Sequence, residues 1–201
     1  MKMRRLLGVM LALGGVVFLW GIGASPAAAD TTTIGLTDGS VTITTLTPTT
    51  ATATFTASAG FAFIDTNVVD LNLNTGITLG TFSGNGGALT SEGAANVSAF
   101  GIINTTFDQF DGCGPGNFST TDTINLSGGT TAASYVTPNT DGWLAAAHIC
   151  NLTTGFTFFT AGNTTTTIIS TVPEPSSLSM LGFGLVSLGG LGGWIRRRRP
   201  A

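Results

Sequence analysis

The chain has 201 residues, seven basic and ten acidic side chains, and a formal net charge of −3. Every Lys and Arg lies within the first five or the last six residues, so the long region between them has one histidine, His148, and no other basic side chain. Binding to phosphate requires cationic side chains that displace counterions, which all but excludes nucleic acid or anionic lipid as a partner of this region.

Residues 1–29 are typical of a secretory signal peptide. A short basic segment precedes an apolar run at about residues 6–22, and Ala27 and Ala29 supply the small residues that signal peptidase requires. We predict export through the Sec machinery and cleavage after Ala29, which leaves Asp30 as the first mature residue. An uncleaved N-terminal anchor is the alternative, because the apolar run is somewhat long for a signal peptide.

Residues 30–171 alternate between apolar and polar side chains, which is the period of a half-buried strand. About ten such runs occur, at residues 33–46, 51–65, 69–74, 77–82, 97–107, 124–126, 133–136, 143–149, 156–159 and 165–172. Gly, Asn and Asp separate the runs, and Asp38-Gly39 is a hairpin signal. We therefore predict one all-β domain, an antiparallel β-sandwich of Greek-key or jelly-roll type; a solenoid is the rival, but no repeat of fixed length occurs.

Some local features refine this prediction. Threonine on alternate positions suits the solvated face of a sheet, and Asp70 and Asn72 are expected to point outward from an ordinary strand. The threonine-rich segments 31–33 and 164–167 are expected to form flanking strands or to carry O-linked glycans. The alanine-rich segment 143–148 is the one moderate helical candidate.

Cys113 and Cys150 are the only cysteines. In an exported protein, a small and even cysteine count favours a disulfide, here between a Gly-rich loop and the element that ends at Cys150. Free thiols or a metal site are the alternatives, but His148 brings the potential ligands to only three.

The sequence contains few residues that suggest catalysis or metal binding. His148 would have to be the general base of any Ser/His/Asp site, with Asp141 as its partner, but no Gly-x-Ser-x-Gly motif occurs, and a half-buried structural histidine is the alternative. Paired carboxylates for glycoside hydrolysis are weakly indicated. We predict no cofactor, with calcium at an acidic turn such as Asp108 and Asp111 as the open alternative.

The last 30 residues combine three signals. They begin with the tetrapeptide Val172, Pro173, Glu174 and Pro175. Proline cannot continue a helix or a central strand, so this peptide is expected to be extended and accessible. The apolar run at about residues 176–195 is long enough to cross a bilayer core of roughly 30 Å as a helix. The chain then carries a basic cluster, which the positive-inside rule places on the cytoplasmic side: Arg196, Arg197, Arg198 and Arg199.

This order of motifs over residues 172–201 resembles the PEP-CTERM sorting domain of Gram-negative bacteria. The resemblance implies that an exosortase, a membrane enzyme similar to transpeptidases, recognises and cuts the tail in a host that makes exopolysaccharide. It implies a transient anchor in the inner membrane, followed by a location on the cell surface or outside the cell. It does not identify an activity for residues 30–171.

We therefore expect a non-enzymatic protein of the envelope or the extracellular matrix. A carbohydrate-binding module for neutral exopolysaccharide is the main alternative, with Tyr135 and Trp143 as candidates for stacking on sugar rings. An exposed row of aromatic side chains would support that alternative, and burial of these two residues would weaken it. A secreted hydrolase that uses His148 is a third and weaker hypothesis.

Overall fold

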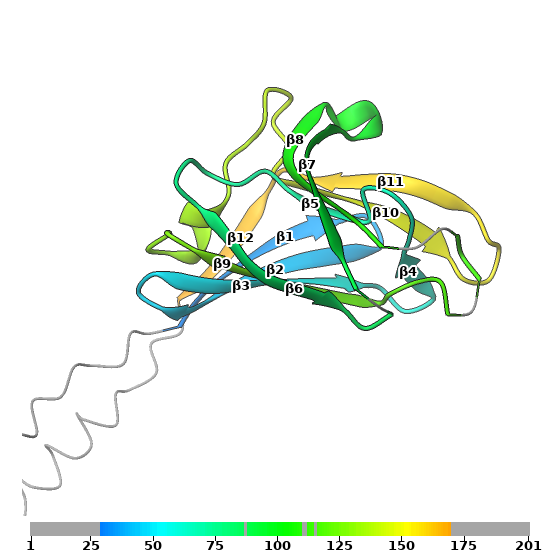
Figure 1. The fold of residues 1–201 in the computed structure, drawn as a ribbon, viewed down its shortest axis with the longest axis horizontal. Helices are drawn as coiled ribbons and strands as arrows, with labels where there is room; N and C mark the ends of the chain where they lie inside the picture. The colour runs from blue at the N-terminus through cyan, green and yellow to red at the C-terminus, as the bar shows by residue number, and fades with distance from the viewer. Residues whose placement is uncertain (1–28, 87, 110–111, 115, 170–201) are drawn as a thin grey trace, which may run out of the picture. The chain divides into compact units, whose positions relative to one another are not determined.

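The computed structural model describes residues 29–86, 88–109, 112–114 and 116–169. This part of the chain is all-β, with two antiparallel sheets that face each other across a hydrophobic core, as in a β-sandwich (Figure 1). The all-β prediction is confirmed, and the described part contains twelve strands where about ten were expected.

Over the described residues, each of the two sheets has six strands, and one strand of the second sheet is short and lies beside its main order. Sheet A has the order β12–β1–β2–β3–β9–β6, formed by Thr165–Ile169, Asp30–Leu36, Gly39–Thr47, Thr50–Ala57, Thr121–Ser127 and Thr78–Gly84. Sheet B has the order β11–β10–β5–β8–β7, formed by Thr157–Gly162, Ala145–Asn151, Val69–Leu71, Ile102–Asp108 and Thr90–Asn96. The short strand β4 (Phe61–Phe63) also pairs with β10.

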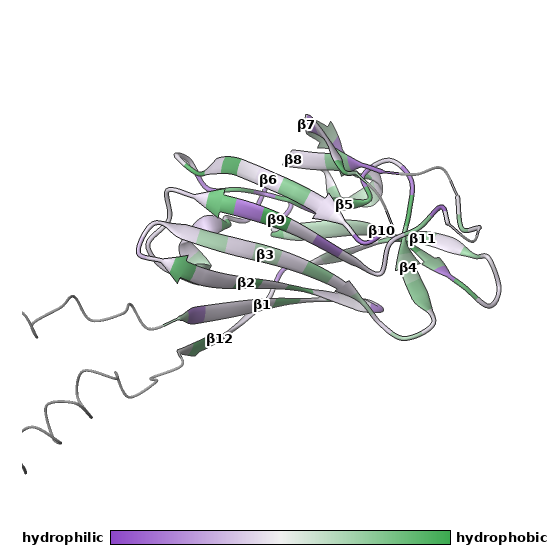
Figure 2. Cartoon of the chain, turned by 60° about the horizontal axis from the view of Figure 1, so that its bottom comes forward, coloured by the Kyte–Doolittle hydropathy of each residue, from purple (hydrophilic) through white to green (hydrophobic). Residues whose placement is uncertain are grey.

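Sheet A follows the predicted alternation. In β2, Val41 and Ile43 are buried in the core while Thr42 and Thr44 lie on the opposite, solvent-facing side, and β3 and β9 repeat the pattern. Figure 2 shows the resulting stripes of hydropathy along β9. Branching at Cβ favours the extended backbone, so threonine supports these strands while its hydroxyl group remains accessible to water.

The β12–β1–β2 side of sheet A follows the sequence predictions. The Asp38-Gly39 signal forms the β1–β2 hairpin, in which Leu36 pairs with Gly39 and Asp38 adopts a positive φ of 61°. The two threonine-rich flanking segments pair with each other as β1 and β12, with Asp30 opposite Ile169. The first and last strands of the described region are therefore neighbours.

Sheet B departs from the prediction in two places. The alanine-rich helical candidate is strand β10, because a position between β11 and β5 buries its small side chains on both faces. Asp70 and Asn72 were expected to point outward, and this is wrong: both are buried. Their side of sheet B is covered by a second apolar cluster of Val97, Ile103 and Ala146, and Ala146 is the register partner of Asp70.

Asparagine side chains perform the bridging role that ion pairs have in other proteins. The Asn104 amide accepts the Leu73 N–H at 2.8 Å and donates to the Leu73 carbonyl at 2.7 Å, which joins two segments of sheet B. The Asn139 Nδ2 donates to the carbonyls of Phe100 and Ile102, at 2.8 and 3.1 Å. These amides satisfy backbone hydrogen-bonding groups without Lys or Arg.

Residues 28–170 form one compact unit that contains both sheets and both apolar clusters. Such a unit has what independent folding requires, namely its own core and strand pairings that all lie within it. Within the described residues, none of the helices has the length and apolarity to cross a bilayer.

Candidate functional site

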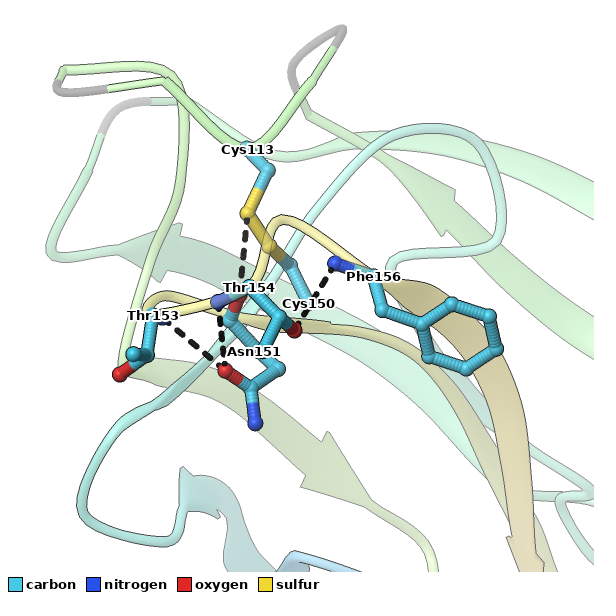
Figure 3. Close-up of a disulfide and its surroundings, with 6 residues drawn as sticks. All are labelled: Cys113, Cys150, Asn151, Thr153, Thr154 and Phe156. Atoms are coloured by element: carbon cyan, nitrogen blue, oxygen red, sulfur yellow. Dashed lines mark hydrogen bonds between the residues drawn. A yellow bond between two sulfur atoms is a disulfide. The ribbon is translucent and has the colours of Figure 1, made fainter.

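A disulfide between Cys113 and Cys150 fixes one end of the sandwich (Figure 3). The Cα atoms are 5.9 Å apart, within the usual range, and the bond closes a segment with a sequence separation of 37. It joins the loop before β9 to the end of strand β10, as predicted, and Cys150 is fully buried. The same loop is held again at Ser119, which exchanges two backbone hydrogen bonds with Phe63.

The tip of the β10–β11 hairpin lies beside this bond and is organised by one side chain. The Asn151 Oδ1 accepts the N–H groups of Thr153 and Thr154, both at 3.0 Å. Gly155 then adopts a positive φ of 70°, and its N–H donates to the Asn151 carbonyl at 2.8 Å. We refer to the disulfide and residues 151–156 as the disulfide corner; its backbone is held in one arrangement by these bonds.

Three phenylalanine rings adjoin the disulfide corner and form what we term the phenylalanine row: Phe61, Phe158 and Phe156. Phe61 of β4 meets Phe158 of β11 edge to face at 6.3 Å, and Phe158 stacks on Phe156 at 6.0 Å. Phe61 and Phe158 are half-buried against the core, whereas Phe156 is 66% exposed. Aromatic faces with exposed edges bind apolar faces of ligands, including those of sugar rings.

His148 is a second candidate, on the other face of β10. Its ring stacks on Phe159 at a centroid distance of 4.1 Å, and its Nδ1 is 3.8 Å from the Asp65 Oδ2. Burial lowers the pKa of His148, and the Asp65 carboxylate opposes that shift. The hypothesised partner Asp141 lies instead in the turn between Asn139 and Trp143 and is not brought to His148.

Asp70 lies fully buried in β5, in the middle of sheet B. Its Oδ1 accepts the Phe107 N–H at 3.3 Å, and its Oδ2 has no hydrogen-bond partner among the described residues. Burial raises the pKa of Asp70 well above 3.8, and the Phe107 N–H opposes the shift. A carboxyl group in such surroundings favours its neutral, protonated form.

Asp122 is a second buried carboxyl, on the core side of β9 in sheet A. Neither of its oxygens has a hydrogen-bond partner in the described region, and the pairing residue Gly84 leaves room for the carboxyl group because it lacks a side chain. Burial raises the pKa of Asp122 from 3.8 to about 6. The Ser119 hydroxyl lies near enough to oppose this shift but does not meet hydrogen-bond geometry.

Tyr135 and Trp143, the two aromatic residues expected to stack on sugar rings, differ in their burial. Tyr135 is fully buried and donates its hydroxyl to the Gly129 carbonyl at 3.1 Å, while Trp143 is half-buried and packs on Phe100 at 5.1 Å. The Tyr135 ring is therefore not accessible to a sugar, and the Trp143 ring is accessible only in part. Asp111 lies outside the described residues, and the described part contains no group of three or more His, Cys, Asp or Glu side chains suited to a metal ion.

The two terminal signals lie outside the described residues: Ala27 and the sorting motif with its arginine cluster. Sequence reasoning missed the phenylalanine row, although the run at residues 156–159 contains three phenylalanines and so carried a signal. It also missed Asp65, which has a positive φ of 67° in the loop before β5 and gives no local signal of its contact with His148. No protein-family model, curated protein or solved structure matches this chain.

Proposed function

We propose that this chain is a non-enzymatic exported protein of the cell surface or extracellular matrix. The observation that carries the proposal is the Cys113–Cys150 disulfide, because such bonds persist in oxidising compartments outside the cytoplasm. The two buried carboxyl groups, which a hydrolase would need close together, lie in different sheets: Asp70 is in sheet B and Asp122 is in sheet A. The buried His148 ring is held by Phe159 rather than presented beside a nucleophile.

The processing route follows from the terminal segments. Residues 1–29 direct export through Sec and are removed by signal peptidase, and residues 172–201 hold the chain in the inner membrane as a helix. An exosortase-type enzyme then cuts near the tetrapeptide at residues 172–175. The β-sandwich of residues 30–171 is released or attached at the surface, where the host's exopolysaccharide surrounds it.

The intact mass of the protein recovered from its host, measured separately for membranes and medium, tests this route. We expect a species that starts at Asp30, ends near Pro173 to Pro175 and is two hydrogens lighter than the reduced chain. A Pro173→Ala, Pro175→Ala double variant should accumulate with its tail in the membrane fraction. If the unaltered protein keeps residues 176–201 in all fractions, the tail is a permanent anchor and the sorting route is wrong.

A second candidate function is binding of neutral glycan, and the phenylalanine row favours it. The row lies on a backbone fixed by the disulfide corner, so its rings lose little conformational freedom on binding. The region between the termini has no Lys or Arg, which favours a neutral over an anionic polysaccharide. The exposed Phe156 lies in the same hairpin tip as Asn151, Thr153 and Thr154, and its ring points away from them (Figure 3).

Truncation of the row provides the test of glycan binding. We expect Phe156→Ala to weaken binding of the host's neutral exopolysaccharide by roughly tenfold in Kd, the effect of removing an aromatic anchor. Affinity electrophoresis or calorimetry measures this change. Leu46→Ala is the matched control, because Leu46 is 62% exposed on β2 and lies outside the row. If the two variants bind the exopolysaccharide with equal affinity, the phenylalanine row is not part of a glycan site.

A further inference from the structure

The open edge of β12 is the feature of the described region that most needs a partner. β12 pairs with β1 on one side, and sheet A ends there. Alternate backbone N–H and C=O groups of an outermost strand point away from the sheet and are available to another strand. All five residues of β12 are Thr or Ile, and the strand contains no charge, proline or glycine.

The remaining outer strands of the described region are each protected. The pairing of β6 is irregular between Leu79 and Phe82, and that of β7 is irregular around Gly93. Bulges of this kind twist an edge strand and hinder its pairing with a strand of another chain. β7 also carries the charge of Glu92. β11 is approached by the end of β1, where the Thr37 N–H donates to the Thr160 hydroxyl at 2.8 Å. Only β12 combines a regular register with an uncharged, β-branched sequence.

We propose that β12 pairs with β12 of a second copy of this chain, so that two A sheets become continuous. Sheet A already joins its strands through facing threonine hydroxyls, as in Thr33–Thr42 at 3.4 Å and Thr32–Thr167 at 3.1 Å. A threonine-rich, uncharged strand is therefore the partner that continues this chemistry, and β12 is itself such a strand. The proposal is independent of the sorting route and of the glycan site.

Full overlap of two antiparallel β12 strands fixes their register. The two-fold axis then passes beside Thr167, which faces Thr167 of the other copy, and Thr166 faces Ile168. Ile168 is 63% exposed in the single chain, and the pairing would cover it. A closed two-fold contact uses both open edges at once and therefore stops at a dimer. A pairing of five residues is short, so we expect a reversible dimer rather than an obligate one.

The charges of the chain set the salt dependence of the dimer. All acidic side chains except Glu174 lie between residues 30 and 171, with no Lys or Arg among them, so two copies repel each other. β12 itself is uncharged, so salt screens this repulsion without weakening the contact. Association should therefore strengthen as salt increases, opposite to the behaviour of an acidic surface that docks a basic partner.

Sedimentation of residues 30–172, which contain nearly all of the compact unit, tests the proposal. The expected mass rises from one chain toward two with concentration and does so earlier at high salt. Ile168→Lys places a charge on the edge and should leave a monomer. Ile102→Lys is the matched control, because Ile102 is also 63% exposed but lies on β8. A monomer at every concentration, or equal association of the two variants, would overturn the proposal.

Cross-linking tests the register at the cost of one contact, the hydroxyl pair of Thr32 and Thr167. Thr167→Cys should form a dimer through a disulfide between copies under mild oxidation, because directly opposite Cβ atoms lie within reach. Thr165→Cys should cross-link far less, since its partner in this register is Ile169. The same variants in the full chain, exported by its host, show whether the pairing forms there. Equal cross-linking of both, or capture of an unrelated strand while copies of this chain stay single, would contradict self-pairing.

Discussion

Removal of the disulfide is expected to lower the free energy of unfolding by about 3–4 kcal/mol, the chain-entropy value for a closed loop of this length. The variant that tests this is Cys113→Ser with Cys150→Ala, because Cys150 is fully buried and a serine there would leave a hydroxyl without a partner. Urea denaturation monitored by tryptophan fluorescence measures the difference. The loop is attached again at Ser119, so the variant should still fold.

Reducing agent supplies the internal control for this experiment. The unaltered protein in dithiothreitol should match the double variant, and the double variant should not respond to dithiothreitol at all. A Cys113→Ser single variant should resemble the reduced protein, since it leaves Cys150 as a buried thiol. If the unaltered and reduced proteins share one denaturation midpoint, the bond contributes nothing to stability and the disulfide corner is held by its hydrogen bonds alone.

The protein is expected to be more stable at pH 4 than at pH 7. Burial raises the pKa of Asp122 from 3.8 to about 6, so the folded state holds this proton more tightly than the unfolded chain. The stabilisation is complete below pH 3.8 and disappears as the pH rises through about 6, a change of about 3 kcal/mol. Asp70 acts in the same direction, because burial raises its pKa as well.

Most proteins lose stability in acid because protonation breaks carboxylate ion pairs. Here no Lys or Arg lies between residues 6 and 195, so the described region has no such pairs with Lys or Arg to lose. His148 opposes the trend, because burial lowers its pKa and protonation below pH 6.5 then destabilises the folded state.

An Asp122→Asn variant separates these contributions to the pH dependence. Chemical denaturation of this variant between pH 4 and 8 should show a flatter profile than that of the unaltered protein. Asp141→Asn, the same substitution in an exposed turn, is the matched control. A protein whose stability instead falls steadily from pH 7 to pH 4 would show that Asp122 does not govern its response to acid.

The sequence predicted the features that depend on local pattern. Alternation along β2, β3 and β9 was enough to predict half-buried strands, and Asp38-Gly39 identified a hairpin because its turn needs a residue that tolerates positive φ. The disulfide was predictable from an even cysteine count combined with export signals. Each of these inferences rests on residues close in the sequence or on a count.

The features that sequence reasoning missed depend on what lies across the fold. Asp70 alternates with Val69 and Leu71 as an outward residue would, and only the cluster around Ala146 on its side of sheet B makes it buried. The phenylalanine row unites β4 with β11, whose residues are nearly a hundred positions apart. Long-range placement of this kind has no periodic signature, so neither burial nor contact could be read from these residues alone.

The pairing of Asp30 with Ile169 has a mechanical consequence. If the chain is pulled by its two ends, the force acts first on the Asp30–Ile169 pair, and the pairs between β1 and β12 then break one after another from there. If the chain is instead attached through its C-terminal end and loaded at the disulfide corner, the force runs along β12 and all its pairs with β1 resist together. The same strand pair is therefore weak against one direction of pull and strong against the other.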